Sequence, residues 1–392
     1  MFSRFLSRDH DSAVLGNIDR LAWARLVSNA SYRFAPPFVA VIARGLDVSV
    51  AELGVALMFA EFAGLLSPLI GRRIDRANRR SAMALGMSGV ALAAAGAAVS
   101  SGPVTLAAAL FVLSASKVVF DTSLVLWVND HVPYERRGEV VGIIETSWAL
   151  GLFLGVSAMG IATALAGWRW GFVLGAVAMV TSAARLLRGL PRENAHAPVR
   201  PEGRVRIPAA GWLVIAGFFA LLGASQSVGI VFGPWFEDDF GFGSAALVAV
   251  VVATGLVELA ASIGASRVMD RWGKEHSVLR GTALMCATGV GMFAARDTVW
   301  LAVPLVVLFF LGFEFSIVCL LPVAANIVPA AGGVGLGTAV GAGTCGRALM
   351  SSVATALYDS SGPAAAALVA TALSAAAGLL VMRHRQVAGR TQ

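Results

Sequence analysis

Ionisable side chains inside long apolar stretches are the residues of this sequence best placed to carry chemistry. They are Arg33, Glu61, Lys117, Asp121, Glu145, Glu258, Glu314 and Arg347. A charged side chain at the centre of a lipid bilayer costs about 2.5–3.5 kcal/mol, so each needs a partner or a task. Burial also favours the protonated form of a carboxyl group. We therefore expect proton binding in a central cavity, by Glu61 or Asp121 first.

The spacing of these residues suggests partners for some of them. Lys117 and Asp121 are four residues apart and share one helix face. Either they neutralise each other, or Asp121 lies in a cavity and titrates against a solute or a proton. Glu61 has no opposite charge within a helical turn. We expect it to face a cavity or a base from another helix, with Arg33 as the obvious partner.

The remaining four residues have plainer interpretations beside the functional one. Glu314 and Arg347 are central in two successive apolar stretches and could form a structural pair. Glu145 and Glu258 lie nearer to the ends that we expect to face the cytoplasm. There, either could be a water-facing or helix-capping residue, although Glu145 remains a candidate for the cavity.

The elements that must hold these residues are membrane-spanning helices. The chain has 392 residues, 57% of them hydrophobic and only 14% charged, against about 25% charged in soluble domains. Lipid cannot satisfy open backbone groups, so apolar stretches of about 20 residues predict helices. Twelve are present, near residues 21–43, 50–70, 81–100, 104–128, 140–164, 170–189, 210–233, 243–265, 279–296, 300–322, 334–357 and 363–382. The first is the most polar, since it contains Arg25, Asn29 and Arg33.

The positive charges predict how these spans are oriented. Placing both termini in the cytoplasm puts 23 of the 30 Lys and Arg residues on the inner side and three in outer loops. An excess of Lys and Arg in cytoplasmic loops is the general rule for membrane proteins. We therefore expect both ends inside, in the inner (cytoplasmic) membrane.

A basic hairpin lies between the second and third spans, at Gly71–Arg80. Its spacing, Gly-x3-Asp-Arg-x2-Arg-Arg, resembles the loop signature of the major facilitator superfamily. Asn78 stands where that pattern usually has Gly, and Asn tolerates the left-handed turn that Gly would adopt. A second copy, with Asp270 and Arg271, occurs about half a chain later. Such an offset is typical of two parallel repeats.

The resemblance implies twelve helices in two pseudo-symmetric six-helix bundles, at residues 1–188 and 209–392. A polar, proline-containing linker at 189–208 would join them. It also implies that the hairpin residues hold the cytoplasmic side closed in one state of the transport cycle. These gate residues would be Gly71, Asp75, Arg76, Arg79, Asp130, Asp270 and Arg271. Alternatively, the arginines only enforce the topology.

Glycines in the fifth span carry a second similarity. Proton-coupled antiporters of this superfamily often have Gly-x8-Gly-x3-Gly-Pro-x2-Gly-Gly here. This chain matches four of the glycines, with Val156 and Met159 at two other positions; the matching residues are Gly142, Gly151, Gly155 and Gly160. The match favours antiport over symport, although small residues at this spacing also serve ordinary close packing of helices.

The function implied is secondary transport, most similar to the drug and sugar efflux branch of the superfamily. Protons would flow inward as a small organic solute leaves, with cationic lipophilic solutes plausible. The proton gradient would be the energy source, and no cofactor is expected. A proton-coupled importer of a metabolite is the alternative in the same fold. A non-transporting sensor or scaffold is the alternative in another class.

Other classes find little support in the sequence. The phosphate-binding pattern Gly-x4-Gly-Lys-Ser/Thr is absent, so direct use of ATP is not expected. The five His and three Cys are scattered, which indicates neither a metal site nor an enzyme. The basic residues lie in short loops between apolar spans, so nucleic acid is not an expected partner. We expect a monomer whose partners are the lipid bilayer, a solute and protons.

Overall fold

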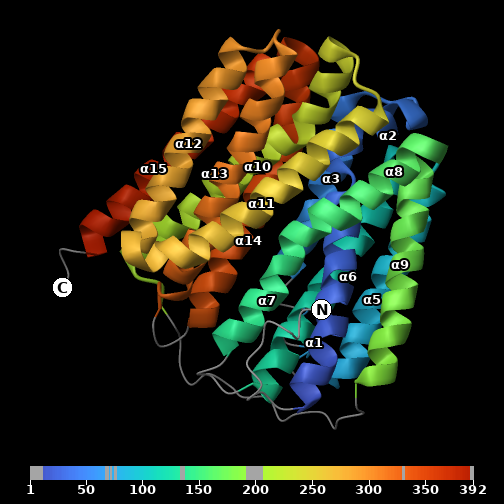
Figure 1. Cartoon of the computed structure of the whole chain (residues 1–392), viewed down its shortest axis with the longest axis vertical. Helices are drawn as coiled ribbons and strands as arrows, with labels where there is room; N and C mark the ends of the chain where they lie inside the picture. Colours follow the sequence, from blue (N-terminus) through green and yellow to red (C-terminus); the bar gives the residue numbers. More distant parts are fainter. Residues whose placement is uncertain are drawn as a thin grey trace. The chain divides into compact units, whose positions relative to one another are not determined.

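The computed structural model describes residues 12–66, 70, 73–74, 77–132, 137–190, 206–328 and 332–388 (Figure 1). Throughout these ranges the regular elements are helices, with no strand. They are α1 (Ser12–Arg33), η2 (Pro36–Phe38), α2 (Val39–Leu46), α3 (Val50–Phe62), η3 (Ala63–Leu66), α5 (Arg79–Ala98), α6 (Pro103–His131), α7 (Arg137–Leu150), η5 (Gly151–Val156), α8 (Ser157–Ala166), α9 (Trp168–Gly189), α10 (Ala209–Phe240), α11 (Ser244–Trp272), α12 (Lys274–Ala294), α13 (Val299–Ala325), α14 (Gly332–Ser361) and α15 (Pro363–Ala388).

Each of the twelve predicted spans coincides with helical residues, which confirms the prediction of an all-helical membrane protein. By length and composition, nine helical stretches among the described residues could each cross a bilayer. They are Arg79–Ala98, Pro103–Val128, Ile144–Ala166, Trp168–Gly189, Ala209–Phe240, Ser244–Met269, Lys274–Ala294, Val299–Ala325 and Pro363–Val387. The first, second and eleventh predicted spans fall outside this set.

Local chemistry explains where several helices begin and end. Asn78 has extended backbone angles (φ −63°, ψ 125°), and its side chain accepts a hydrogen bond from the amide of Ser81. It therefore caps the N-terminus of α5 and does not adopt the left-handed turn expected from the sequence. Gly241 adopts a left-handed conformation (φ +67°) directly after α10 and ends that helix.

Contacts within the chain divide it into two compact units, which we describe separately. Unit 1 contains Met1–Ala35 and Ala63–Pro201. In it, α5 packs against both α6 and α9, and α1 packs against α7, η5 and α9. Figure 1 shows α5 beside α9 in this unit. The interior of unit 1 includes fully buried aromatic side chains such as Trp127, Phe120 and Phe172.

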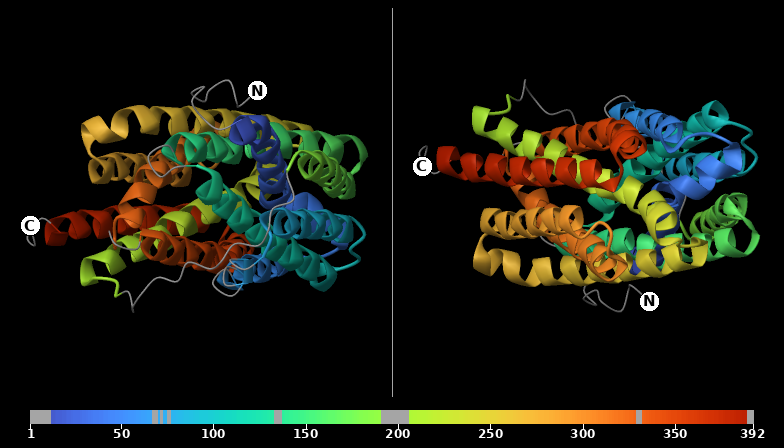
Figure 2. Two further views of the ribbon diagram at one scale, coloured as in Figure 1. Left: turned by 90° about the horizontal axis from the view of Figure 1, so that it is seen from below. Right: turned by 90° about the horizontal axis from the view of Figure 1, so that it is seen from above.

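Unit 2 contains Pro36–Phe62 and Glu202–Gln392, so that a segment from the first half of the sequence packs with the second half. Helix α10 packs against α14 and α15, and α12 packs against α13 and α15. The views in Figure 2 show α15, drawn red, running beside these helices. Helix α3 packs against α14, and the Ala51 amide at its start donates a hydrogen bond of 2.9 Å to Asp359.

The fifth predicted span is one helical run with a π-helical segment in its middle, η5. Its glycines lie against α1: a Cβ added at Gly151 would sit 2.9 Å from the Cβ of Asn29, and one added at Gly155 would overlap Ala30. Gly160 is buried in α8, and Gly142 lies in α7 where the structure does not describe side-chain surroundings. The close approach of η5 to α1 brings the charged residues of α1 and α7 together.

Filling this contact should be costly. We expect Gly155→Ala to lower the free energy of unfolding by about 1–3 kcal/mol, because the new methyl group overpacks the interface. Gly264→Ala is the matched control, since nothing lies within 4 Å of a Cβ at that helical position. It should be neutral or stabilising by up to about 1 kcal/mol. Thermal unfolding of both purified variants in one detergent measures the difference, and equal unfolding temperatures would contradict the packing role.

Candidate functional site

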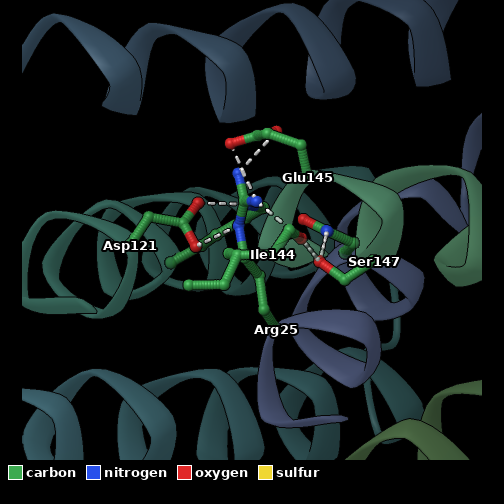
Figure 3. Close-up of polar contacts among 7 residues, drawn as sticks. Arg25, Asp121, Ile144, Glu145 and Ser147 are labelled. Carbon is green, nitrogen blue, oxygen red and sulfur yellow. Dashed lines mark hydrogen bonds and ion pairs between the residues drawn. The ribbon is translucent and has the colours of Figure 1, made fainter. Parts of the chain in front are cut away.

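Arg25 of α1 is the centre of a polar cluster in unit 1 (Figure 3). Its Nη1 lies 2.9 Å from Glu145 Oε1, and its Nη2 donates to Glu145 Oε2 at 3.2 Å. Nη1 also donates to the carbonyl oxygen of Ile144 at 3.0 Å. On the other side, Nε lies 3.7 Å from Asp121 Oδ1. One guanidinium group therefore joins a carboxylate on α6 to a carboxylate on α7.

Asp121 has a second cationic partner on its own helix. The Nζ of Lys117, one turn earlier on α6, donates to Asp121 Oδ2. This is the neutralising pair, one of the two alternatives that their spacing left open. Asp121 Oδ1, by contrast, is inaccessible to solvent and accepts no hydrogen bond from the residues described. Asp121 thus has a cation near each oxygen, but only Oδ2 accepts a hydrogen bond from the residues described.

Aromatic rings border the same cluster. The guanidinium of Arg33 lies 4.6 Å from the centre of the Trp148 ring, and Lys117 Nζ lies 6.0 Å from it. Lys117 Nζ is also 5.6 Å from the centre of the Tyr32 ring. Arg33 donates a hydrogen bond of 3.2 Å to the carbonyl oxygen of Trp148. The negative faces of aromatic rings attract such cations.

Neutral hydrogen bonds hold α1 and α7 in this register. Asn29, one turn after Arg25, donates to the hydroxyl of Ser147 at 3.4 Å. Ser147 in turn donates to the carbonyl oxygen of Ile144 at 2.5 Å, the same oxygen that accepts from Arg25. Two groups therefore share one backbone acceptor, which fixes the height of Arg25 relative to Glu145.

We call Arg25, Arg33, Lys117, Asp121 and Glu145 the α1–α6–α7 cluster. The structure thus unites four residues that the sequence singled out and adds Arg25 at their centre. Opposite charges 4 Å apart attract by about 4 kcal/mol near a protein surface, so a change of charge on one member is felt by its neighbours. The cluster remains accessible, since 28% of the Asp121 side chain and 47% of the Glu145 side chain are exposed.

Unit 2 holds a separate ion pair between Glu61 of α3 and Arg347 of α14. Arg347 Nη2 lies 2.9 Å from Glu61 Oε1, and Nε donates to Oε2 at 3.4 Å. Only 8% of the Glu61 side chain and 13% of the Arg347 side chain are exposed. A Cβ at Gly54 would overlap Thr355, so α3 and α14 lie very close about two turns from this ion pair. The bond is bidentate and largely dry.

Glu314 of α13 has a different environment from the one expected. It is buried and accepts a hydrogen bond of 2.6 Å from Ser262 of α11. The predicted pair of Glu314 with Arg347 is therefore not the one described. Arg347 forms its described ion pair with Glu61, for which we had expected Arg33 as the partner. Glu258, one turn before Ser262, is completely buried, so its interpretation as a water-facing residue is wrong. Helix α11 buries this face where it packs against α13.

The predicted gate is described only in part. Arg79 Nε lies 2.8 Å from Asp130 Oδ2, and Arg79 Nη1 donates to the carbonyl oxygen of Ile74 at 2.7 Å. Arg79 is buried, so this contact ties the start of α5 to the end of α6. Arg271 is exposed in the last turn of α11, and Asp270 lies beside it in the helix with its side chain undescribed. Gly71, Asp75 and Arg76 lie outside the described residues.

Arg25 is the site residue that the sequence analysis did not select. A signal for it exists, because Arg25, Asn29 and Arg33 recur every four residues and so share one face of a helix. The roles of Trp148 and Ser147 carry no such signal. An aromatic and a hydroxyl residue in a membrane span are common, and only the packing of α7 against α1 turns them toward the charges.

Comparison with known proteins supplies the family. The family model "Major Facilitator Superfamily" matches residues 21–332. A search among curated proteins by sequence found no match. Two solved structures are similar over nearly their whole length. One is the human organic anion transporter MFSD10 (TETRAN), with a TM-score of 0.69, 19% identity, and coverage of 93% of this chain and 98% of that one.

The other is a bacterial homologue of the human lysosomal transporter Spinster, in an inward-facing, unoccupied conformation. Its TM-score is 0.71 at 12% identity, with 95% of each chain covered. At these identities the two structures share the fold with this chain. They leave the solute and the direction of its movement to be argued from the residues.

Proposed function

Since this chain belongs to the Major Facilitator Superfamily and is therefore a secondary transporter, we propose that it couples the movement of a small organic solute to protons. The α1–α6–α7 cluster is the observation that carries the proposal. Its two carboxylates are accessible and are held by cations that change partners if one carboxylate takes up a proton. Membrane-embedded acids of this kind are typical of proton pathways.

Coupling then follows from charge. When Asp121 or Glu145 is protonated, Arg25 and Lys117 lose part of the negative charge that holds them. Solute binding responds to the same change, because it occurs beside the same side chains. A ligand shifts a conformational equilibrium only by its difference in affinity for the two states. The proton and the solute therefore act together on one set of contacts between α1, α6 and α7.

Efflux by antiport is the first direction to consider, and the glycines of the fifth span support it. Gly151 and Gly155 pack against α1 next to the cluster, so a movement of this span changes the environment of Arg25. In antiport, proton and solute exclude each other. A cation that competes for Asp121 or Glu145 would meet this requirement.

Symport is the second candidate, and the resident cations favour it. Both carboxylates of the cluster already have positive partners, so a cationic solute would have to displace Arg25 or Lys117. An anion would instead benefit from protonation. MFSD10, one of the two similar structures, is described as an organic anion transporter, which agrees with this second candidate.

The experiment is a proton-flux assay in proteoliposomes that contain a trapped pH dye. A panel of small organic anions, cations and neutral solutes is added outside. At least one class should cause a pH change that requires the protein, and Asp121→Asn together with Glu145→Gln should reduce it at least tenfold. A solute that exchanges across the membrane but is indifferent to an imposed pH gradient would refute proton coupling. If no solute exchanges, a sensor or scaffold is the better account.

The same proposal includes the setting of the transporter. The excess of basic residues in predicted inner loops, 23 against three outside, supports an inner membrane location with both termini in the cytoplasm. Lipid, solute and protons are the partners, and a monomer suffices because both units come from one chain. A protease added to sealed inside-out vesicles should cleave the linker at 189–208. The same protease added to right-side-out vesicles should leave the linker intact.

A further inference from the structure

The charges around Asp121 bear on which solute the transporter takes. We infer that the solute is an organic anion, such as an aromatic carboxylate or sulfonate, and that it binds in the α1–α6–α7 cluster together with a proton. This inference rests on the proposed proton coupling and adds the chemical class of the solute.

The first step is the position of the proton. Asp121 Oδ2 accepts from Lys117 Nζ, whereas Oδ1 accepts no hydrogen bond within the described part of the chain. Arg25 Nε lies 3.7 Å from Oδ1, too far for a hydrogen bond. A proton that reaches Oδ1 can therefore add to it without breaking a hydrogen bond. Asp121 then becomes neutral, and Lys117 and Arg25 keep their charges.

The second step is charge balance. Protonation of Asp121 raises the charge of the cluster by one, and an anion beside Lys117 and Arg25 lowers it by one. Binding the two together leaves the charge as it was. A cation that replaced the proton would instead compete with both resident cations for the same carboxylate. The change in net charge of the cluster is therefore zero for a proton bound together with an anion.

The third step is the organic part of the solute. The centres of the Tyr32 and Trp148 rings both lie near Lys117, at 5.6 and 6.0 Å from its Nζ. A planar anion that reached Lys117 would lie beside aromatic faces. Stacking on such rings is favourable for aromatic groups. We therefore expect a ring next to the carboxylate or sulfonate of the solute.

Several other titratable groups lie on the helices around Asp121. From α1 the neighbouring groups are Arg25, Tyr32 and Arg33, and from α7 it is Glu145. Helix α5 carries Arg79 and Arg80 at its start, where Arg79 pairs with Asp130 more than two turns along α6. The segment η3, which also contacts α6, has the sequence AGLL and no charge. Helix α1 also carries Asp19, more than one turn before Arg25, and α7 carries Glu139, whose side chain the structure does not describe.

The test is binding to the purified full-length transporter in detergent. The probes are benzoate, salicylate and naphthalene-2-sulfonate, with benzylammonium and tetraphenylphosphonium as cations. The anions should stabilise the protein against heat. Titration calorimetry in two buffers of different ionisation heat should show proton uptake with the anion. Anion affinity should fall as the pH rises, by up to about tenfold per pH unit for one linked proton.

Two variants sharpen the test. Asp121→Asn carries the neutral side chain permanently, so it should bind the anions at every pH without proton uptake. Asp297→Asn is the matched control: it removes one exposed carboxylate outside the cluster and should keep the wild-type pH dependence.

Contrary results are distinct for the two proposals. Stabilisation by the cations alone, or by none of the three anions, overturns the anion inference while proton flux in vesicles stands. Weaker anion binding by Asp121→Asn also overturns it. Anion binding without proton uptake, combined with flux that ignores a pH gradient, overturns the proton coupling itself.

Discussion

Arg25→Gln should reduce proton-driven accumulation of the solute by at least about tenfold, which lies within the usual range of coupling between two binding sites. The Gln side chain cannot carry the charge that joins Glu145 to Asp121. Both carboxylates lose a cationic partner. They then bind protons without passing the change to each other, and α1 is no longer tied to the Ile144 carbonyl by a charged donor.

The measurement is flux into proteoliposomes with and without an imposed pH gradient. Arg25→Lys keeps the charge but not the bidentate geometry, so it should recover part of the gradient-dependent flux. Arg169→Gln is the matched control, because Arg169 is an exposed arginine of unit 1 that contacts Ser100 and Trp168 outside the cluster. Full gradient-dependent flux in Arg25→Gln would remove this residue from the coupling mechanism.

The second large effect concerns the buried pair of Glu61 and Arg347. Glu61→Gln and Arg347→Gln should each destabilise the protein by about 3–5 kcal/mol, since each removes one of the two charges of a largely buried ion pair. The double variant has no uncompensated charge in the pair and should be more stable than either single one. A thermodynamic cycle of the four proteins isolates the interaction.

Thermal unfolding of the four proteins at one pH gives the cycle, and flux gives the functional consequence. If Glu61 also carries a proton during transport, Glu61→Gln should lose gradient-dependent flux even in the more stable double variant. If the pair is only structural, the double variant should transport as the wild type does. If the loss of stability in the double variant equals the sum of the losses in the two single variants, the 2.9 Å contact contributes no coupling energy.

The positions of the helices were predictable because their cause is local. Lipid offers no hydrogen bonds to the backbone, so an apolar stretch of sufficient length must be helical. All twelve stretches predicted from the sequence contain helix, from α1 through α15. The pair of Lys117 and Asp121 was predictable for a similar reason, since residues four apart on a helix meet wherever that helix goes.

Partners on different helices were not predictable in this way. Arg25 contacts Glu145 across 120 residues of sequence, and Glu61 contacts Arg347 across 286. Spacing along the chain says nothing about such pairs. They depend on which faces of two helices meet, and here the glycines decide it: Gly155 lets η5 approach α1, and Gly54 lets α3 approach α14. The predicted partner of Glu61 was of the correct type, an arginine, but the packing supplies Arg347 in place of Arg33. Glu314 accepts a hydrogen bond from Ser262.

The amino-acid sequence by itself determined the helical spans, the family and most of the charged residues within the spans, because hydrophobicity and charge act wherever the residue stands in the chain. Tertiary structure alone decided how those charges combine: Arg25 between two carboxylates, and Glu61 with Arg347. The physical reason is that a buried charge is stabilised only by groups within a few ångströms. Those groups come from whichever helices close packing brings alongside.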